Sequence, residues 1–140
     1  MRWAHVGLNC RDPRVTVDFY VQWFGFSLAR VVPLDGQEII FLRNDASYLE
    51  LFASSQSQSQ LGQGDGPQNP GAIRHLAFQV DNVDSFLKEI GDAADITLGP
   101  LNFDPFIPGW RTVWIRDPDG VIIEVSQGYH DQRPEELSGQ

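Results

Sequence analysis

Apolar and polar residues along the chain repeat one order twice: a strand-like run, a helix-like run, then three further strand-like runs. Alternation with a period of two predicts strands, whereas apolar spacings of three and four predict helices. The two helical patterns stop at Gly25 and Gly91, a residue type typical of helix ends. Strands are predicted over 3–10, 26–33, 37–43, 47–53, 72–80, 96–100, 111–116 and 121–127, and helices near 13–24 and 83–90.

The repeat divides the chain into two modules of the same element order. We therefore expect an α+β fold in which two paired βαβββ modules form one structural domain. The first module covers residues 1–53 and the second covers residues 72–127. Residues 54–71, rich in Ser, Gln and Gly, are expected to form a linker, with a lid over a bound ligand as the alternative. Residues 128–140 are expected to form a polar tail.

Two histidines and two glutamates occupy matching positions in the two modules. His5 and His75 lie in the first strand of each module, and Glu50 and Glu124 interrupt the apolar last strand. Taken singly, each has an ordinary explanation, such as a hydrogen-bonded histidine or a solvent-facing carboxylate. A carboxylate among apolar neighbours is costly unless it is paired or bound to a cation. The repetition favours one site of two imidazoles and two carboxylates, which suits Zn, Ni, Co, Mn or Fe(II).

The composition narrows the classes of protein and partner. Hydrophobic residues make up 41% and charged residues 21%, as in a soluble globular protein. A net charge of −9 argues against nucleic acid and membrane partners. Cys10 is the only cysteine, which excludes an intrachain disulfide and a cysteine-rich zinc site. With no secretory or membrane-spanning apolar run, a cytoplasmic protein is expected.

Several short stretches of sequence carry a resemblance to a known family. They are His5 at the first strand, Val17-Asp18-Phe19-Tyr20 with Phe24-Gly25-Phe26, Tyr48-Leu49-Glu50-Leu51, Arg74-His75-Leu76-Ala77-Phe78, and Asp117-Pro118-Asp119-Gly120 before Ile123-Glu124-Val125. Over about residues 3–127 the chain resembles the vicinal oxygen chelate superfamily, which includes glyoxalase I, extradiol dioxygenases and bleomycin resistance proteins. The resemblance implies paired modules that form a curled mixed sheet around a metal-containing cavity.

The resemblance also implies the site. A divalent metal would be held by His5, Glu50, His75 and Glu124, in the ligand order of glyoxalase I. It implies a glyoxalase-like lyase or isomerase that binds neighbouring oxygens of a small-molecule substrate and moves a proton through an enolate-like intermediate. Glu124 or Glu50 would be the base, with Glu124 favoured. The alternatives are an Fe(II) extradiol-type dioxygenase, which does not need Glu50, and a non-catalytic binding or resistance protein. A homodimer is also implied.

Residues on the strand faces that carry the glutamates are candidates for substrate contact. Tyr48 and Phe52 share a face with Glu50, because side chains alternate along a strand. The family resemblance turns Thr112 and Trp114 toward the substrate in the second module. One departure from glyoxalase I is Asn9, which stands where that enzyme has an arginine that binds glutathione.

Overall fold

The computed structural model describes residues 1–57 and 61–139 of the chain. The chain divides into two compact units. The first unit contains residues 1–62 together with the short segment Asp117–Val121. The second contains residues 63–116 and 122–140.

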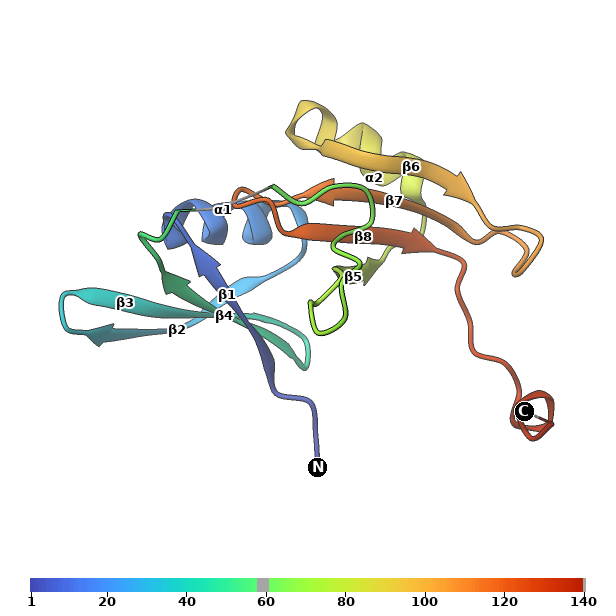
Figure 1. The fold of residues 1–140 in the computed structure, drawn as a ribbon, viewed down its shortest axis with the longest axis horizontal. Coiled ribbons are helices and arrows are strands. Elements are labelled where there is room, and N and C mark those ends of the chain that lie inside the picture. Colours follow the sequence, from blue (N-terminus) through green and yellow to red (C-terminus); the bar gives the residue numbers. More distant parts are fainter. Residues whose placement is uncertain (58–60, 140) are drawn as a thin grey trace. The chain divides into compact units, whose positions relative to one another are not determined.

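The first unit is a four-stranded mixed sheet with one helix (Figure 1). Its strands lie in the order β1-β4-β3-β2, with β1 parallel to β4 and the other pairs antiparallel. The helix begins after Asp12, whose side chain accepts a hydrogen bond from Arg14 N, and Pro13 takes a first-turn position. The elements are β1 (His5–Cys10), α1 (Pro13–Trp23), β2 (Ser27–Leu34), β3 (Gln37–Asn44) and β4 (Ser47–Ala53).

One face of this sheet and α1 form the apolar core of the first unit. Alternate residues of β1, β3 and β4 are buried on that face: Leu8, Cys10, Ile40, Leu42, Leu49 and Leu51. Thr16 and Tyr20 of α1 are fully buried as well, so α1 covers this face. Because side chains alternate, the opposite face of the sheet carries His5 of β1 and Glu50 of β4.

The segment Asp117–Val121 contributes buried polar contacts to the first unit. The Tyr20 hydroxyl donates to Asp117 Oδ2 (2.9 Å), and Asp117 Oδ1 accepts from the backbone N–H groups of Asp119 (2.8 Å) and Val121 (2.9 Å). The Thr16 hydroxyl donates to Asp119 Oδ2 (3.2 Å). Burial of the Asp117 carboxyl raises its pKa above the ordinary value of 3.8, although the hydrogen bonds act in the other direction.

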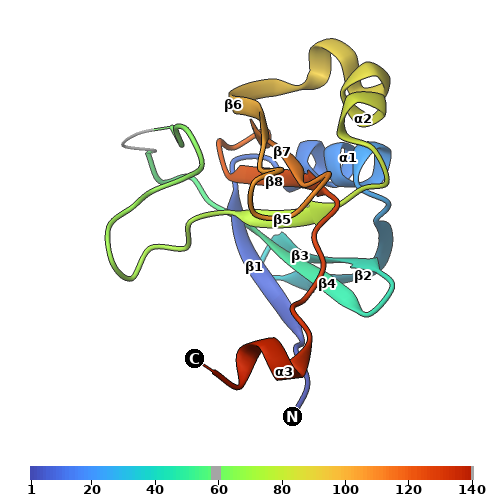
Figure 2. The same ribbon diagram turned by 90° about the vertical axis from the view of Figure 1, so that its right-hand side faces the viewer.

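The second unit has the same topology as the first. Its strands lie in the order β5-β8-β7-β6, again with the first pair parallel and the others antiparallel. Figure 2 shows this sheet with β6 uppermost and β5 lowest. The elements are β5 (Leu76–Gln79), α2 (Val83–Ile90), the 3₁₀ turn η1 (Gly91–Ala93), β6 (Asp95–Asn102), β7 (Arg111–Arg116), β8 (Ile122–Gln127) and α3 (Pro134–Leu137).

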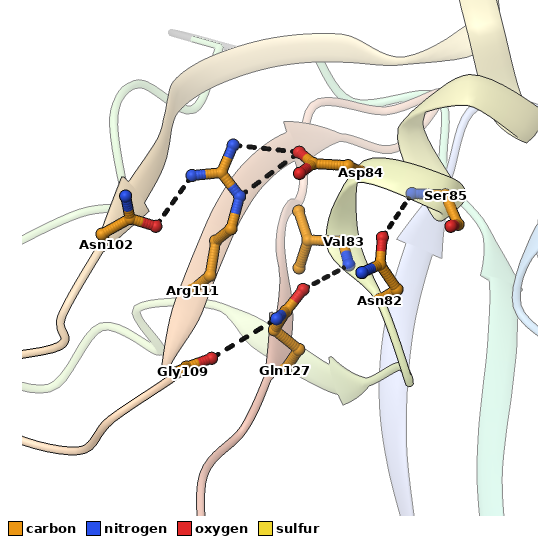
Figure 3. Close-up of polar contacts among 8 residues, drawn as sticks. All are labelled: Asn82, Val83, Asp84, Ser85, Asn102, Gly109, Arg111 and Gln127. Carbon is orange, nitrogen blue, oxygen red and sulfur yellow. Dashed lines mark hydrogen bonds and ion pairs between the residues drawn. The ribbon is translucent and has the colours of Figure 1, made fainter.

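Polar contacts attach the first turn of α2 to β7 and β8 (Figure 3). Asn82 caps the helix by accepting from Ser85 N (2.8 Å), and Gln127 Oε1 accepts from Val83 N (2.7 Å). Arg111 of β7 donates to Asp84 Oδ1 (2.9 Å). Since Arg111 and Gln127 both reach α2, that face of the sheet is the one covered by the helix. The residues that share it are fully buried: Val113, Ile115, Ile123 and Val125.

The predicted α+β class and the paired βαβββ modules are confirmed. Each module forms its own four-stranded sheet. The strand predicted over 72–80 is shorter, because β5 begins at Leu76 and His75 lies just before it. A short helix, α3, occurs in the predicted tail, where Glu136 accepts from Arg133 N (2.9 Å). None of the helices in the described residues is both long and apolar enough to cross a lipid bilayer.

Candidate metal site

His5 and Glu50 form a close pair on the open face of the first sheet. His5 Nε2 lies 3.1 Å from Glu50 Oε1, with the side chains 40% and 19% exposed. The parallel register aligns Gly7 with Glu50, so His5 is two residues before Glu50's partner on β1 and on the same face. Gly7 has no side chain beside the His5–Glu50 pair, and a Cβ there would lie 3.5 Å from the Phe52 ring.

Aromatic residues surround this first pair. Phe41 of β3 is aligned with Glu50, and its ring meets the His5 ring edge-on with centroids 5.9 Å apart. Tyr48 and Phe52 lie on either side of Glu50 along β4, and both are half-buried. Both residues therefore lie on the face of β4 that strand alternation predicts, the face that carries Glu50. The contact of either one with a substrate stays a prediction.

His75 and Glu124 form the corresponding pair in the second unit. His75 Nε2 lies 3.5 Å from Glu124 Oε1, and both side chains are about one-fifth exposed, at 22% and 21%. His75 Nδ1 lies 2.7 Å from the backbone oxygen of Asp65. The Asp65 carboxylate is in turn paired with Arg74 (2.9 Å). Asp65 lies in the segment predicted to be a linker. The polar composition of that segment did not indicate that Asp65 would contact His75.

The Asp65 carbonyl determines which nitrogen of His75 is available. A carbonyl oxygen only accepts, so the proton of a neutral His75 ring lies on Nδ1 and the lone pair is on Nε2. That lone pair faces the Glu124 carboxylate, and two acceptors at this distance repel unless a proton or a cation lies between them. A histidine whose far nitrogen donates to a carbonyl is the usual arrangement of a metal ligand.

Within each pair, the spacing of the histidine nitrogen and the carboxylate oxygen is close to that of two ligands of one cation. Two ligand atoms that each lie about 2.1 Å from one ion stand about 3.0–3.4 Å apart at angles between 90° and tetrahedral. The separation is 3.1 Å in the first pair, within this range, and 3.5 Å in the second, just above it. Within the described residues, no three or more His, Cys, Asp or Glu side chains gather closely enough to hold an ion. Each unit therefore supplies two candidate ligands.

Trp114 and Thr112 lie on the same face of the second sheet as Glu124. Trp114 is aligned with Glu124 across β7 and β8, and its Nε1 is buried without a hydrogen-bond partner among the described residues. An unpaired buried donor costs free energy, so Trp114 has an N–H available for a ligand oxygen. The Thr112 hydroxyl is 2.9 Å from Ser126 Oγ, which also accepts from Trp110 Nε1 (3.1 Å). The Thr112 hydroxyl therefore already has a hydrogen-bond partner within the protein.

Comparison with known proteins identifies the family. The model of the Glyoxalase/Bleomycin resistance protein/Dioxygenase superfamily matches residues 2–125. The chain belongs to this superfamily. The match includes both modules and all four residues of the two pairs, which agrees with the resemblance seen in the sequence.

Individual relatives of this superfamily member cover most of the chain. The uncharacterized protein YwkD of Bacillus subtilis (strain 168) is 28% identical over 124 residues, which is 86% of this chain and 92% of that protein. The crystal structure of the glyoxalase family protein from Enterococcus faecalis is 29% identical with a TM-score of 0.66, and the match covers 89% and 96% of the two chains. The fosfomycin resistance protein FosX from Listeria monocytogenes has a TM-score of 0.69 at 15% identity, covers 92% and 94%, and shares the fold.

Proposed function

We propose that the chain is a divalent-metal-dependent enzyme of the glyoxalase type, a lyase or isomerase. The His5–Glu50 and His75–Glu124 pairs would supply four ligands to one ion of Zn, Ni, Co, Mn or Fe. The observation that carries the proposal is the repeated pairing of a histidine Nε2 with a carboxylate oxygen at 3.1 Å and 3.5 Å.

The chain's own residues account for proton movement. When bound, the ion acts as a Lewis acid on neighbouring substrate oxygens. Glu124 accepts a proton from the carbon next to a carbonyl and returns it to the adjacent carbon, so that no net charge is left on the protein. The Trp114 N–H donates to a substrate oxygen as negative charge develops there. The Asp65 carbonyl keeps the His75 ring in the orientation and tautomer that a ligand needs.

The position of Glu50 favours this function over an Fe(II) dioxygenase. A dioxygenase of this superfamily would need only three ligands, His5, His75 and Glu124. In this chain a fourth candidate ligand, Glu50, lies 3.1 Å from His5. The remaining histidine, His130, is exposed after β8, with Nδ1 3.1 Å from the Asp131 backbone oxygen. A glyoxalase-type site uses Glu50, so the Glu50→Gln variant separates the two reactions.

The first experiment measures metal content by elemental mass spectrometry after loading tag-free protein with each of the five ions. We expect about one ion per chain in the wild type and a marked loss in His5→Ala and His75→Ala, because each replacement removes one of only four ligands. Glu38→Gln is the control, since Glu38 is an exposed carboxylate of the same sheet that pairs with Arg14 (2.8 Å). An equal loss in the control, or no metal in the wild type under any loading, would contradict the metal site.

The second experiment tests the reaction. Exchange of a carbon-bound hydrogen for deuterium is followed by NMR with 2-oxoaldehyde hemithioacetals and 2-oxoacids. Loss of exchange in Glu124→Gln and in Glu50→Gln supports the proposed enzyme. Dioxygen consumption with catechols that survives Glu50→Gln would instead identify the dioxygenase. Saturable ligand binding with neither reaction would identify a binding or resistance protein.

A further inference from the structure

A pocket of about 500 Å³ opens on the first sheet, over β2, β3 and the start of β4. It lies within the first unit and is lined by Ser27, Leu28, Ala29, Arg30, Phe41, Arg43 and Tyr48. Phe41 connects it to the His5–Glu50 pair, because Phe41 lines the pocket, is aligned with Glu50 and contacts the His5 ring. The pocket is therefore next to the proposed ligands of the first unit.

An irregularity in β2 turns Arg30 into this pocket. Leu28 is aligned with Leu42, but Arg30 is aligned with Phe41, so Ala29 is an extra residue on β2. Leu42 belongs to the buried face under α1, and Phe41 belongs to the opposite face. In a regular strand Leu28 and Arg30 would share a face, whereas the bulge places Arg30 beside Phe41. Bulges often redirect a side chain next to a functional site.

The two guanidinium groups of the pocket have no carboxylate partner in the described part of the chain. Arg30 forms no hydrogen bond or ion pair there, and Arg43 donates Nε to the Asp45 backbone oxygen (2.8 Å) and lies over the Tyr48 ring at 5.9 Å. The chain has nineteen acidic and ten basic residues, so carboxylates are plentiful. Other arginines do form ion pairs: Arg14, Arg74, Arg111, Arg116 and Arg133.

We propose that this pocket binds an anionic oxygen group, a carboxylate or a phosphate, on the substrate. Arg30 and Arg43 would neutralise the anion, since a guanidinium is suited to bind either group. The Phe41 and Tyr48 rings would contact the part of the ligand next to it. That this ligand is the enzyme's substrate rests on the proposed function, whereas anion binding itself rests on the pocket alone.

The sheet register indicates how long the substrate would be. Arg43 is aligned with Tyr48, and Tyr48 is aligned with His5, so Arg43 and His5 are two strands apart on one face. Neighbouring strands are spaced by about 4.8 Å, which separates their backbones by about 10 Å. The expected substrate therefore carries its anionic group several bonds from the oxygens that reach the metal ligands.

The test is isothermal titration of the metal-loaded protein with succinate and with inorganic phosphate at constant ionic strength. In the double variant Arg30→Gln/Arg43→Gln we expect the dissociation constant of the preferred anion to rise at least about tenfold, as charge-assisted hydrogen bonds are lost. Arg14→Gln/Arg133→Gln is the matched control, because it removes two exposed guanidinium groups that lie outside the pocket. Stronger binding of succinate would identify a carboxylate ligand, and stronger binding of phosphate a phosphate ligand.

Two results would overturn the proposal: no saturable binding of either anion to the wild type, or equal affinity in the wild type and the double variant. Equal affinity would also be the outcome if the anion bound the metal directly, since the double variant keeps the metal ligands. Metal content is measured on the same samples. A metal-free wild type that still binds anions through both arginines would contradict the proposed function and leave this inference standing.

Discussion

Replacing Tyr20 with phenylalanine should destabilise the first unit. The Tyr20 side chain is fully buried, and its hydroxyl donates to Asp117 Oδ2 at 2.9 Å. The variant keeps the ring packing and removes only this hydrogen bond, which leaves a buried carboxylate oxygen without that donor. Hydrogen bonds to charged groups contribute roughly 1.5–3 kcal/mol. A loss of about 2 kcal/mol would lower the Tm of a chain of this size by roughly 6–10 °C.

The assay is thermal unfolding followed by circular dichroism, with Tyr129→Phe as the matched control. The Tyr129 hydroxyl also donates to an aspartate, Asp131 Oδ1, at 2.9 Å, but Tyr129 is exposed. Water replaces an exposed hydrogen bond, so this control should leave the Tm unchanged. Equal effects of the two replacements would refute the role of burial in the argument.

The effect of Tyr20→Phe should also depend on pH. The pKa of Asp117 is raised, mainly because burial disfavours the charged carboxylate, while the Tyr20 hydroxyl acts to lower it. In the variant that pKa rises further, so the cost of keeping Asp117 ionised increases. The difference in unfolding free energy between wild type and variant should be largest at neutral pH. It should shrink as the pH falls through the raised pKa and the carboxyl becomes protonated in both proteins.

Three further predictions concern stability, histidine orientation and thiol reactivity. Trp114→Phe removes a buried, unpaired donor, so urea unfolding of the ligand-free protein should show unchanged or greater stability while substrate turnover falls. Gly66→Ala should lower metal affinity, because a Cβ at this positive-φ residue would overlap the Arg74 backbone oxygen and displace the loop that holds His75. Gly71→Ala, also at positive φ but in open space, should not, as metal titrations can establish. Cys10 is 1% exposed and burial raises its pKa to about 11, so Ellman's reagent should react with it only after unfolding; rapid labelling of the native protein would contradict this.

Much of the fold was predictable from the sequence because hydrophobic periodicity and polar positions repeat in the two modules. Alternation along β4 correctly placed Glu50 on the face opposite Leu49 and Leu51, and the same reasoning placed Glu124 opposite Ile123 and Val125. These assignments depend only on regular strand geometry, which a short apolar run specifies well. His5 approaches Glu50 because β1 pairs in parallel with β4, whereas His75 lies just before β5, next to the parallel pair of β5 and β8.

Contacts that depend on backbone irregularity were not predictable. Arg30 reaches its pocket through an extra residue at Ala29, and nothing in that stretch of sequence marks a bulge. Asp65 lies in a segment whose Ser, Gln and Gly content indicated a linker, yet its carbonyl oxygen accepts from His75. A backbone oxygen carries no sequence signal, because every residue has one.

The two units of this chain cannot be exchanged as continuous stretches of sequence. The first unit includes the distant segment Asp117–Val121, so the chain passes from one unit to the other three times. A fragment that ended at Gly62 would lack Asp117 and Asp119, and would leave the Tyr20 and Thr16 hydroxyls without their partners. Gene duplication can produce such a repeat, but a later exchange of residues 1–62 with those of a relative would keep these hydrogen bonds only if residues 117–121 were exchanged together with them.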